Sequence, residues 1–353
     1  MAALFAATLA ACLTEPQLKV RSPATPTDVG DGWAVSTPEK EGLDGEGLDR
    51  ALDLFYSDTA FHNAVALLVA RHGHLVLEAY ARDASERERK RNIQSATKSV
   101  TSLVFGITRD RGYFGDLDQP LHEILTQDFG SDPRKKDITL RHLLTMTSGI
   151  AFDNDDFTVE LLVDRPGDPV AHILDKPLYA EPGDSFYYRD ADPQLLSAAV
   201  TRVTGETLEQ IARTDLFQPL GITDFHWEAD GAGTTLGPIG LFLRPRDRVK
   251  VGQLVLSRGI WQGRRLVSEQ WIELSTSTQV MGHDPEAPYG FYWWIVPELG
   301  AVTAMGHGGN YIFVARESDL VIVLESLPHA NADAGAPLDR FLGLARLVVA
   351  AAR

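Results

Sequence analysis

The chain has 353 residues, a formal net charge of −16 at pH 7 and a single cysteine. This acidic balance argues against nucleic acid and anionic membrane surfaces as partners, because like charges repel. One cysteine excludes a disulfide framework and a cysteine-based metal site. Hydrophobic residues make up 44% of the chain, which is enough for one large domain or two closely joined ones.

The N-terminus resembles a bacterial lipoprotein signal. Met1 to Ala11 is apolar or small throughout, and Cys12 follows at the position where such leaders are cut and lipidated. No Lys or Arg precedes the apolar run, so an ordinary N-terminal segment is the alternative. Leu13 to Pro38 is rich in Pro, Thr, Ser and Asp, which predicts a flexible tether. We therefore expect residues 1–35 to lie outside the fold.

This N-terminus also suggests a location. A processed leader would place the protein in the bacterial cell envelope, either periplasmic or lipid-anchored at Cys12. If the leader is not processed, the cytoplasm is the alternative.

The next part of the chain predicts a helix, a hairpin and a second helix. Asp44 to Phe55 has apolar residues at helical spacing, with Asp44 as a cap. Ala64 to Ala70 and Leu75 to Ala81 are apolar runs around a short Gly-containing turn, which predicts a β-hairpin. Ser95 to Asp110 repeats apolar residues at 3, 4 and 7 spacing, as a helix does.

The middle of the chain predicts helices and loops, and strands return toward the end. The predicted helices are Pro120–Leu125, Ile138–Met146, Pro193–Thr204, Thr207–Leu216, Arg246–Arg258 and Leu338–Ala352. The predicted strands are Tyr289–Trp294 and Val302–Met305, followed by a hairpin of Tyr311–Arg316 and Leu320–Leu324. Because hairpins dominate both ends, the sheet should be mainly antiparallel, with helices on its faces.

These elements predict an α/β (α+β) fold. Residues 36–115 and 235–353 should form one α/β domain with a mainly antiparallel sheet flanked by helices. Residues 116–234 should form a second, largely helical lobe. The cleft between the two lobes is the expected site.

The main chemical feature is a Ser-x-x-Lys box, Ser95-Ala96-Thr97-Lys98, at the predicted start of a helix. Residues i and i+3 share a helix face, so the Lys98 amine can reach the Ser95 hydroxyl. A neutral amine can take the serine proton, and burial lowers a lysine pKa toward that neutral form. The helix start also offers free N–H groups to an oxyanion. The box alone is weak, because it also occurs by chance on surface helices.

Three further motifs give the box a context. Thr139 to Gly149 is close to the sequence LRHLLTHTSG, Glu181 to Asp190 follows the pattern PGxxFxYSN, and Gly306 to Gly309 stands near the end of the chain. In this order, the four motifs resemble the serine β-lactamase and penicillin-binding-protein superfamily. The nearest branch is the class C β-lactamase-related serine hydrolases, which include esterases, D-amino-acid peptidases and nylon-oligomer-type hydrolases. The resemblance covers the chain from about Trp33 onward.

The resemblance implies a catalytic set. It makes Ser95 the acylating nucleophile and Lys98 the base that activates it. Tyr188 would pass the proton to the leaving group, and a phenol needs nearby cations to do so at neutral pH. The N–H groups of Ser95 and Asn310 would form the oxyanion hole.

The same resemblance implies residues that contact substrate. His307 takes the place of a lysine, and Gly308 and Gly309 would let a substrate carbonyl approach the backbone. Asp190 stands where the family has an Asn, which donates a hydrogen bond to the acyl amide, and an ionised Asp cannot donate. Asp190 could also pair with Lys98 and keep that lysine charged. The sequence leaves the role of Asp190 open.

These departures favour small esters over β-lactams. We therefore expect a carboxylesterase that forms an acyl-enzyme, and a β-lactamase or D-amino-acid amidase or peptidase is the enzymatic alternative. A non-catalytic cell-envelope binding protein with the same fold is the alternative of another class. The expected partner is a small acyl substrate. We expect no cofactor and no metal, because His72 and His74 lie in a predicted turn without further ligands nearby.

Overall fold

The computed structural model describes residues 19, 21, 24–154, 167–283, 286–327 and 336–352. The predicted leader and Cys12 lie outside the described residues, so lipid anchoring stays a prediction. None of the described helices combines the length and the apolar character that crossing a bilayer requires.

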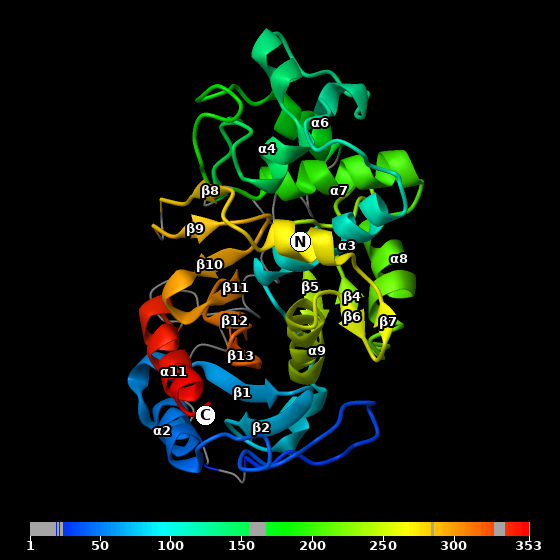
Figure 1. Ribbon diagram of the computed structural model, residues 1–353. Helices are drawn as coiled ribbons and strands as arrows, with labels where there is room; N and C mark the ends of the chain where they lie inside the picture. The colour runs from blue at the N-terminus through cyan, green and yellow to red at the C-terminus, as the bar shows by residue number, and fades with distance from the viewer. Residues whose placement is uncertain are drawn as a thin grey trace, which may run out of the picture.

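The core of the protein is an eight-stranded sheet in which every neighbouring pair is antiparallel, in the order β2-β1-β13-β12-β11-β10-β9-β8. Both ends of the chain contribute to it, as predicted (Figure 1). The strands are β1 (Ala64–Arg71), β2 (His74–Tyr80), β8 (Val280–Met281), β9 (Pro288–Tyr289), β10 (Trp294–Val296), β11 (Ala301–Gly306), β12 (Asn310–Ala315) and β13 (Leu320–Ser326).

Helices cover both faces of this sheet. Helices α2 (Gly45–Ser57) and α11 (Leu338–Ala350) pack on one face, and α9 (Pro245–Leu256) packs on the other (Figure 1). Strand β1 is apolar from Ala64 to Ala70 because alternate residues enter different cores. Leu67 and Val69 join the cluster that contains α2 and α11, whereas Leu68 joins the cluster that contains α9.

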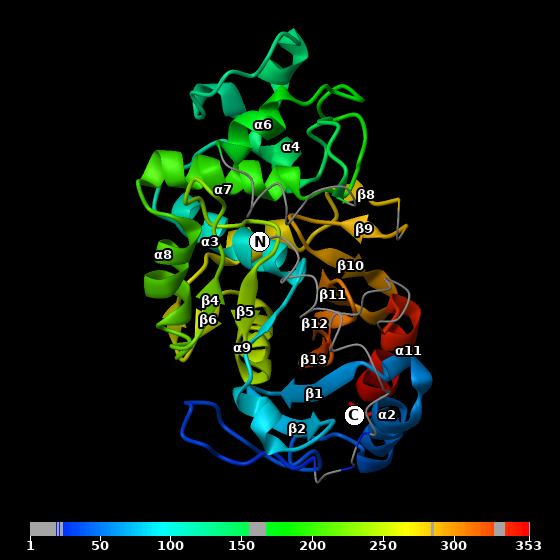
Figure 2. The ribbon, with the colours of Figure 1, turned by 180° about the vertical axis from the view of Figure 1, so that it is seen from behind.

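The second lobe is mainly helical and lies beyond the end of the sheet that carries β8 (Figure 1, Figure 2). Its helices are α4 (Leu140–Leu144), α6 (Pro169–Asp175) and α7 (Ala191–Thr204). Helix α8 (Leu208–Ile211) lies beside α3 (Ala96–Asp110) and runs on into a π-helical turn (Ala212–Phe217). A small sheet of β3 (Arg91–Asn92), β5 (Leu241–Leu243) and β4 (His226–Trp227) lies beside α9 and α3.

The remaining elements are short. They are 3₁₀ turns at Thr59–Phe61, Ala84–Glu88, Leu121–Glu123, Pro133–Asp137 and Pro297–Leu299, helix α10 (Glu269–Ser275), and the hairpin of β6 (Ile260–Trp261) and β7 (Arg264–Arg265).

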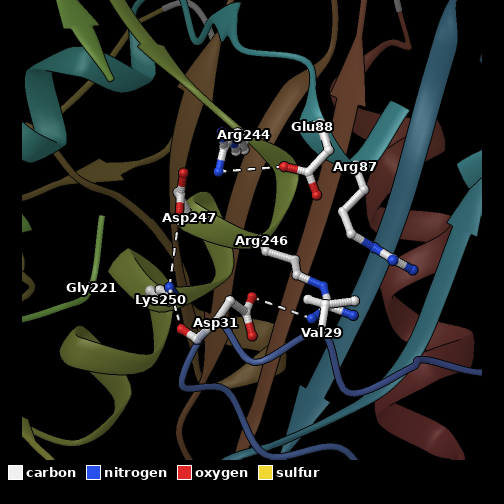
Figure 3. A pocket seen from close by; sticks show the side chains of 9 residues that line it. All are labelled: Val29, Asp31, Arg87, Glu88, Gly221, Arg244, Arg246, Asp247 and Lys250. Carbon is white, nitrogen blue, oxygen red and sulfur yellow. Dashed lines mark hydrogen bonds and ion pairs between the residues drawn. The ribbon is translucent and has the colours of Figure 1, made fainter. Parts of the chain in front are cut away.

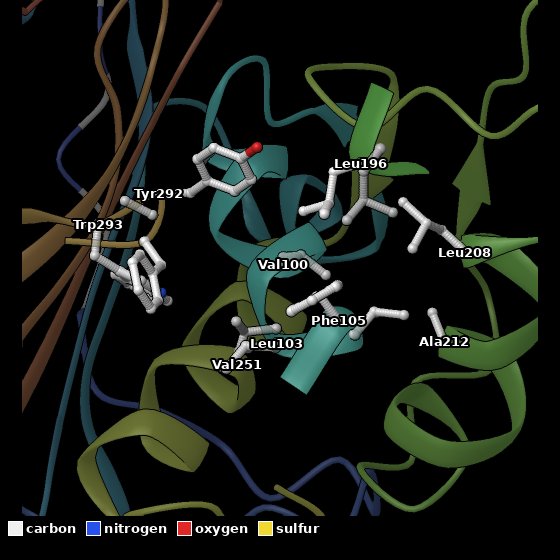
Figure 4. Packing of buried hydrophobic residues seen from close by; sticks show 14 of the residues in the cluster. Val100, Leu103, Phe105, Leu196, Leu208, Ala212, Val251, Tyr292 and Trp293 are labelled. Atoms are coloured by element: carbon white, nitrogen blue, oxygen red, sulfur yellow. The ribbon is translucent and has the colours of Figure 1, made fainter. Parts of the chain in front are cut away.

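Helix α3 (Ala96–Asp110) occupies the centre of the molecule, and its residues from Ala96 to Thr108 are all buried. Figure 4 shows Val100, Leu103 and Phe105 on this helix among side chains of α7, α8, α9 and the β9–β10 segment. Gly106 lets α10 pack closely, because a Cβ there would lie 2.1 Å from the Trp271 ring. The helix that begins at the Ser-x-x-Lys box is therefore rigidly enclosed.

Most predicted elements are present, and the differences have local causes. The predicted strand Tyr289–Trp294 is wrong, because the chain leaves the sheet after Tyr289 and re-enters it at Trp294. Tyr292 lies between them with φ 65°, a conformation that a strand does not contain. The predicted helix Pro120–Leu125 is only a 3₁₀ turn. Helices α6 and α10 were not predicted.

The expectation of a flexible tether is wrong for its described part. The Ala24 carbonyl accepts a hydrogen bond from the Glu78 N–H at 2.8 Å, and Val35 forms a parallel bridge with Leu75. Trp33 is 4% exposed and its ring lies 5.2 Å from that of Trp261. One buried aromatic side chain and these backbone hydrogen bonds fix a segment whose polar composition predicted disorder.

A pocket of about 180 Å³ lies between this N-terminal segment and α9 (Figure 3). Its charged side chains already have partners. Arg246 contacts Asp31 at 3.2 Å, and Lys250 contacts Asp247 at 3.8 Å. The Arg246–Asp31 ion pair and a hydrogen bond of 3.2 Å from Lys250 Nζ to the Asp31 carbonyl join the N-terminal segment to α9, so we assign the pocket a structural role.

Candidate active site

Ser95 lies at the junction between β3 and α3, where it takes the N-cap position of the helix. The preceding residue, Gln94, has φ 55° and its N–H donates to Asn92 Oδ1 at 2.8 Å. A left-handed conformation at a residue other than glycine costs about 1 kcal/mol. This turn places Ser95 at the positive end of α3, where backbone N–H groups stabilise negative charge.

The end of β11 packs against the same junction. A Cβ on Gly306 would lie 2.1 Å from the Ile93 carbonyl oxygen and 3.2 Å from Gln94 Cβ, so only glycine allows this approach. The contact brings the turn between β11 and β12 beside Ser95. Two motifs that are far apart in the sequence therefore meet at one place.

Lys98 lies one helical turn after Ser95 and is 1% exposed. Its Nζ is 2.8 Å from Ser95 Oγ, 3.2 Å from the Pro238 carbonyl oxygen and 2.6 Å from Asp190 Oδ1. Several oxygens around one buried nitrogen suit an ammonium group, which has three N–H donors. The segment with Pro238 is fixed to α3 by Thr101, whose hydroxyl donates to the Gly237 carbonyl at 2.8 Å.

The charge state of Lys98 depends on its pairing with Asp190. Burial alone would lower its pKa, but the charge of Asp190, the Tyr188 phenol and hydrogen bonds to both raise the pKa of Lys98 above its ordinary value. The sequence left open whether Asp190 pairs with Lys98 and keeps it charged, and the structure shows this pairing at 2.6 Å. The adjacent carboxylate therefore outweighs burial.

Tyr188 belongs to the same cluster. Lys98 Nζ lies 4.7 Å from the centre of its ring, which is half-buried. The ring stacks on Trp294 at 5.9 Å with an interplanar angle of 29° and meets the Tyr289 ring edge-on at 6.4 Å. Strands β9 and β10 thus hold the Tyr188 ring in place beside the lysine.

Asn154 was not among the residues predicted from the sequence to belong to the site. Its Oδ1 accepts a hydrogen bond from the Asp190 N–H at 2.8 Å, and its Nδ2 contacts the Tyr188 carbonyl at 3.5 Å. An amide can accept and donate at once, which its acidic neighbours cannot do. An Asn within an acidic run was the one available indication of this role.

The residues that begin α7 use their carboxylates inside the protein. Asp190 is the N-cap residue of α7, yet its side chain caps no N–H and instead meets Lys98. Asp192 accepts a hydrogen bond from the Ser148 hydroxyl at 2.5 Å and lies 3.9 Å from Arg189. Burial raises the pKa of Asp192 to about 6, against the opposing effects of Arg189 and Ser148.

The residues predicted to contact substrate after β11 have different environments. His307 is exposed, whereas Gly309 is buried with φ 92°, and a Cβ there would lie 2.7 Å from the Ala336 nitrogen. Packing against Ala336 therefore accounts for Gly309, and no approaching substrate is needed to explain it. Gly308, with φ 80°, also has a glycine conformation.

The Asn310 side chain points into the protein. Its Oδ1 accepts from Arg248 Nη1 at 2.7 Å, and its Nδ2 donates to the His307 carbonyl at 3.0 Å. Only the backbone N–H of Asn310 is left for the predicted oxyanion hole. Within the part of the chain that the structure describes, no group of three or more His, Cys, Asp or Glu side chains is placed to hold a metal ion.

Known proteins share both the sequence pattern and the fold. The Beta-lactamase family matches residues 59–345. The 6-aminohexanoate-dimer hydrolase of Paenarthrobacter ureafaciens is 27% identical over 336 residues, which cover 87% of this chain and 81% of that protein.

Two solved structures are similar across almost their whole length. A family VIII carboxylesterase has a TM-score of 0.69 at 17% identity and covers 90% of this chain and 99% of its own. A penicillin-binding-protein homologue from Caulobacter crescentus has a TM-score of 0.69 at 14% identity, over 89% of this chain and 98% of its own. These likenesses confirm the predicted fold class.

Proposed function

Because the chain belongs to the Beta-lactamase family of serine hydrolases, we propose that it is a carboxylesterase that cleaves small acyl esters through an acyl-enzyme. The family membership confirms the resemblance drawn from the motifs. One observation carries the proposal: the buried Lys98 Nζ lies 2.8 Å from Ser95 Oγ. A nucleophile within hydrogen-bond reach of a proton-transfer group is the arrangement that covalent catalysis requires.

The proposed reaction has two halves. In the first, Ser95 Oγ attacks the ester carbonyl, its proton passes to Lys98, and the alcohol leaves with a proton delivered past the Tyr188 phenol. In the second, water repeats the attack on the Ser95 ester and releases the acid. The N–H groups of Ser95 and Asn310 would stabilise the oxyanion of each tetrahedral intermediate.

The charges around the site favour an uncharged ester. Asp190 is already paired with Lys98 at 2.6 Å. His307 stands where a lysine would offer a fixed positive charge, and a neutral imidazole offers none. A substrate carboxylate, such as that of a β-lactam, would therefore gain little from this site.

Short-chain p-nitrophenyl esters test the proposal, with Ser95→Ala as the inactive control. We expect the wild type to release p-nitrophenol and to form one fluorophosphonate adduct on the peptide that contains Ser95. If wild type and Ser95→Ala are equally inert while ligands still raise the melting temperature, the protein is a binding protein. A label on another residue would contradict the assigned nucleophile.

A linear amide is the second candidate substrate. The relative that supports it is the 6-aminohexanoate-dimer hydrolase, which aligns with 87% of this chain. The same acylation and deacylation steps would cleave an amide, although an amine leaves less readily than p-nitrophenol. Comparing a p-nitrophenyl ester, the matching p-nitroanilide and nitrocefin on one enzyme preparation separates esterase, amidase and β-lactamase activity.

A further inference from the structure

The contacts of Lys98 raise a question about where its proton goes. An ammonium group cannot accept the Ser95 proton until it has released one of its own. Among the described residues, its partners are Ser95 Oγ, the Pro238 carbonyl, Asp190 Oδ1 and the Tyr188 phenol. Ser95 is the source of the proton in the reaction, Tyr188 passes a proton to the leaving group, and a peptide carbonyl is not a useful base. Asp190 is the remaining group that can take the proton.

We propose that Asp190 accepts a proton from Lys98 during catalysis, so that the two residues act as one proton-accepting pair. This inference rests on the proposed acyl-enzyme reaction. It replaces the substrate-binding role predicted for Asp190, and it makes Asp190 a partner of the reacting atoms.

The proposed reaction begins with a proton transfer within the Lys98–Asp190 pair. One proton moves from Lys98 to Asp190 and leaves a neutral amine beside a carboxylic acid. The Ser95 O–H bond then breaks toward Lys98 Nζ while the Oγ–C bond forms and the carbonyl becomes an oxyanion. When the C–O bond to the leaving group breaks, the alkoxide takes the Lys98 proton. The proton on Asp190 can then return to Lys98, and water follows the same sequence in deacylation.

The fold dedicates the Asp190 carboxylate to this contact. Asp190 is 5% exposed, so bulk water does not compete for its charge. Its side chain makes no N-cap hydrogen bond to α7, although Asp commonly does so at this position. Its N–H is held by Asn154. Because a carboxylate and an amine at 2.6 Å in a dry site can exchange one proton without a change of net charge, the exchange avoids charging the interior.

The other titratable groups near Lys98 and Asp190 are kept neutral by burial or are engaged by partners of their own. From the β9–β10 segment, Tyr289 and Tyr292 face the site, and burial raises the pKa of both phenols well above the ordinary value, so they stay neutral. From α7, Asp192 is engaged by Ser148 and Arg189. Asp192 is thus a second buried carboxylate two residues away, and it provides a matched control.

The test is the pH dependence of kcat/KM for p-nitrophenyl acetate, from about pH 5 to about pH 10. In the wild type, Lys98 and Asp190 together become net neutral when the pair loses its first proton, which a carboxylate allows at acidic pH. This neutral pair can already accept the Ser95 proton, so activity should begin at acidic pH. In Asp190→Asn the amine must lose its proton to water, so the acidic limb should move to higher pH. We expect a loss of at least about a hundredfold at pH 6 that shrinks about tenfold per pH unit toward alkaline pH.

Asp190→Glu keeps a carboxylate and should recover the activity at low pH. This variant tests the inference even if Asp190→Asn folds poorly. Asp192→Asn should keep the acidic limb of the wild type.

The alternative role of Asp190, keeping Lys98 charged, predicts that the acidic limb of Asp190→Asn moves in the opposite direction. If Asp190 only keeps Lys98 charged, removing it lets burial lower the amine pKa, and the acidic limb moves to lower pH with a gain at neutral pH. That result, or an equal loss at every pH, overturns the inference. Equal hydrolysis by wild type and Ser95→Ala overturns the proposed function and this inference with it. An inert Ser95→Ala beside an unshifted Asp190→Asn overturns the inference alone.

Discussion

Two buried clusters in this protein combine a carboxylate, a cation and a tyrosine, and they differ in what the cation can do. On the edge strand β2, Glu78 accepts two hydrogen bonds from Arg246, two from Arg87 and one from Tyr80 (Arg246 and Arg87 appear in Figure 3). In the candidate active site, Lys98 meets Asp190. Both carboxylates are almost fully buried, at 3% and 5% exposure.

The difference lies in the chemistry of the nitrogen. A guanidinium does not give up its proton in a protein, and its planar fork holds a carboxylate in one geometry. The Glu78 cluster is therefore fixed charge that joins β2, α9 and the N-terminal segment. An ammonium is a point charge that can lose a proton, and Lys98 has a nucleophile on one side and a carboxylate on the other. One cluster supports the fold, and the other can do chemistry.

Exchanging the cations of the two clusters, Lys for Arg and Arg for Lys, should have the largest effect on activity. Lys98→Arg keeps a positive charge beside Asp190 but removes a group that can carry a proton, so we expect kcat to fall about 10⁴-fold, or about 5 kcal/mol. Ester hydrolysis measures this loss, and circular dichroism checks that the larger side chain is accommodated. Lys98→Met is the second variant, because it keeps most of the volume and removes the charge.

The reciprocal change in the other cluster is the matched control. Arg246→Lys shortens the fork that binds Glu78, so it should lower the melting temperature while kcat stays at the wild-type value. Substantial activity in Lys98→Arg would contradict proton transfer through residue 98. A strong loss of kcat in folded Arg246→Lys would contradict the division into a structural and a chemical cluster.

Removing the charge of Glu78 should mainly affect stability. Burial alone would raise the pKa of Glu78, but hydrogen bonds from Arg246, Arg87 and Tyr80 lower it below the ordinary value. Glu78→Gln leaves the half-buried Arg87 without this carboxylate and the buried Arg246 with Asp31 as its remaining carboxylate, so the free energy of unfolding should fall by about 4 kcal/mol. Urea unfolding measures this loss, and a change of less than about 1 kcal/mol would contradict the structural role.

The lowered pKa of Glu78 also predicts how its contribution to stability changes with pH. A lowered folded-state pKa means that Glu78 contributes stability above its unfolded pKa, and this contribution is lost as the pH falls through the folded pKa. The difference between wild type and Glu78→Gln should therefore be present at neutral pH and shrink in acid.

The contribution of Asp192 to stability should depend on pH in the opposite sense to that of Glu78. Burial raises the pKa of Asp192 to about 6, so its contribution to stability is present below the unfolded pKa and lost as the pH rises through 6. Asp192→Asn stays neutral and should therefore be more stable than wild type at pH 8 by up to about 3 kcal/mol, with little difference near pH 4. Urea unfolding at both pH values measures the change.

Asp247 is the matched control for this prediction, because burial also raises its pKa to about 6 in the structural region. Asp247→Asn should give a similar stability profile and leave ester hydrolysis unchanged. A stability difference in Asp192→Asn that does not vary with pH would show that the Arg189 contact outweighs burial.

The sequence could predict the parts of the site that depend on local spacing. Ser95 and Lys98 are three residues apart on one helix, so their contact follows from helix geometry. Tyr188 and Asp190 were found because they occur in a recognisable motif, and the apolar runs of β1 and β2 predicted the hairpin. These features need few long-range contacts.

The features that escaped prediction depend on distant neighbours. The Pro238 carbonyl contacts Lys98, but a backbone carbonyl carries no mark in the sequence. The sequence raised the pairing of Asp190 with Lys98 but left it open, because only the packed fold determines their distance and with it the pKa direction of Lys98. The break between β9 and β10 follows from Tyr292, whose phenol donates to the Leu143 carbonyl of the helical lobe at 3.0 Å. The preference for contacts between the lobes overrode the strand pattern.

Asn154 is expected to give the smallest effect and tests how accurately the chemical cluster must be placed. Its side chain contacts the Asp190 N–H and the Tyr188 carbonyl, so it acts as a positioning residue. Asn154→Ala removes these contacts, and we expect kcat to fall about tenfold, or about 1.4 kcal/mol, with KM nearly unchanged. Asn154→Gln, which keeps the amide on a longer chain, should recover part of the loss.

The pH profile separates positioning from a merely structural role of Asn154. If Asn154 places Asp190 against Lys98, its loss loosens the pair and should move the acidic limb of the Asn154→Ala profile toward that of Asp190→Asn. A mutation that only weakens the fold would lower the melting temperature and leave the limb in place. Unchanged kcat, KM and pH profile would show that the aromatic contacts of Tyr188 with Trp294 and Tyr289 suffice to place the cluster.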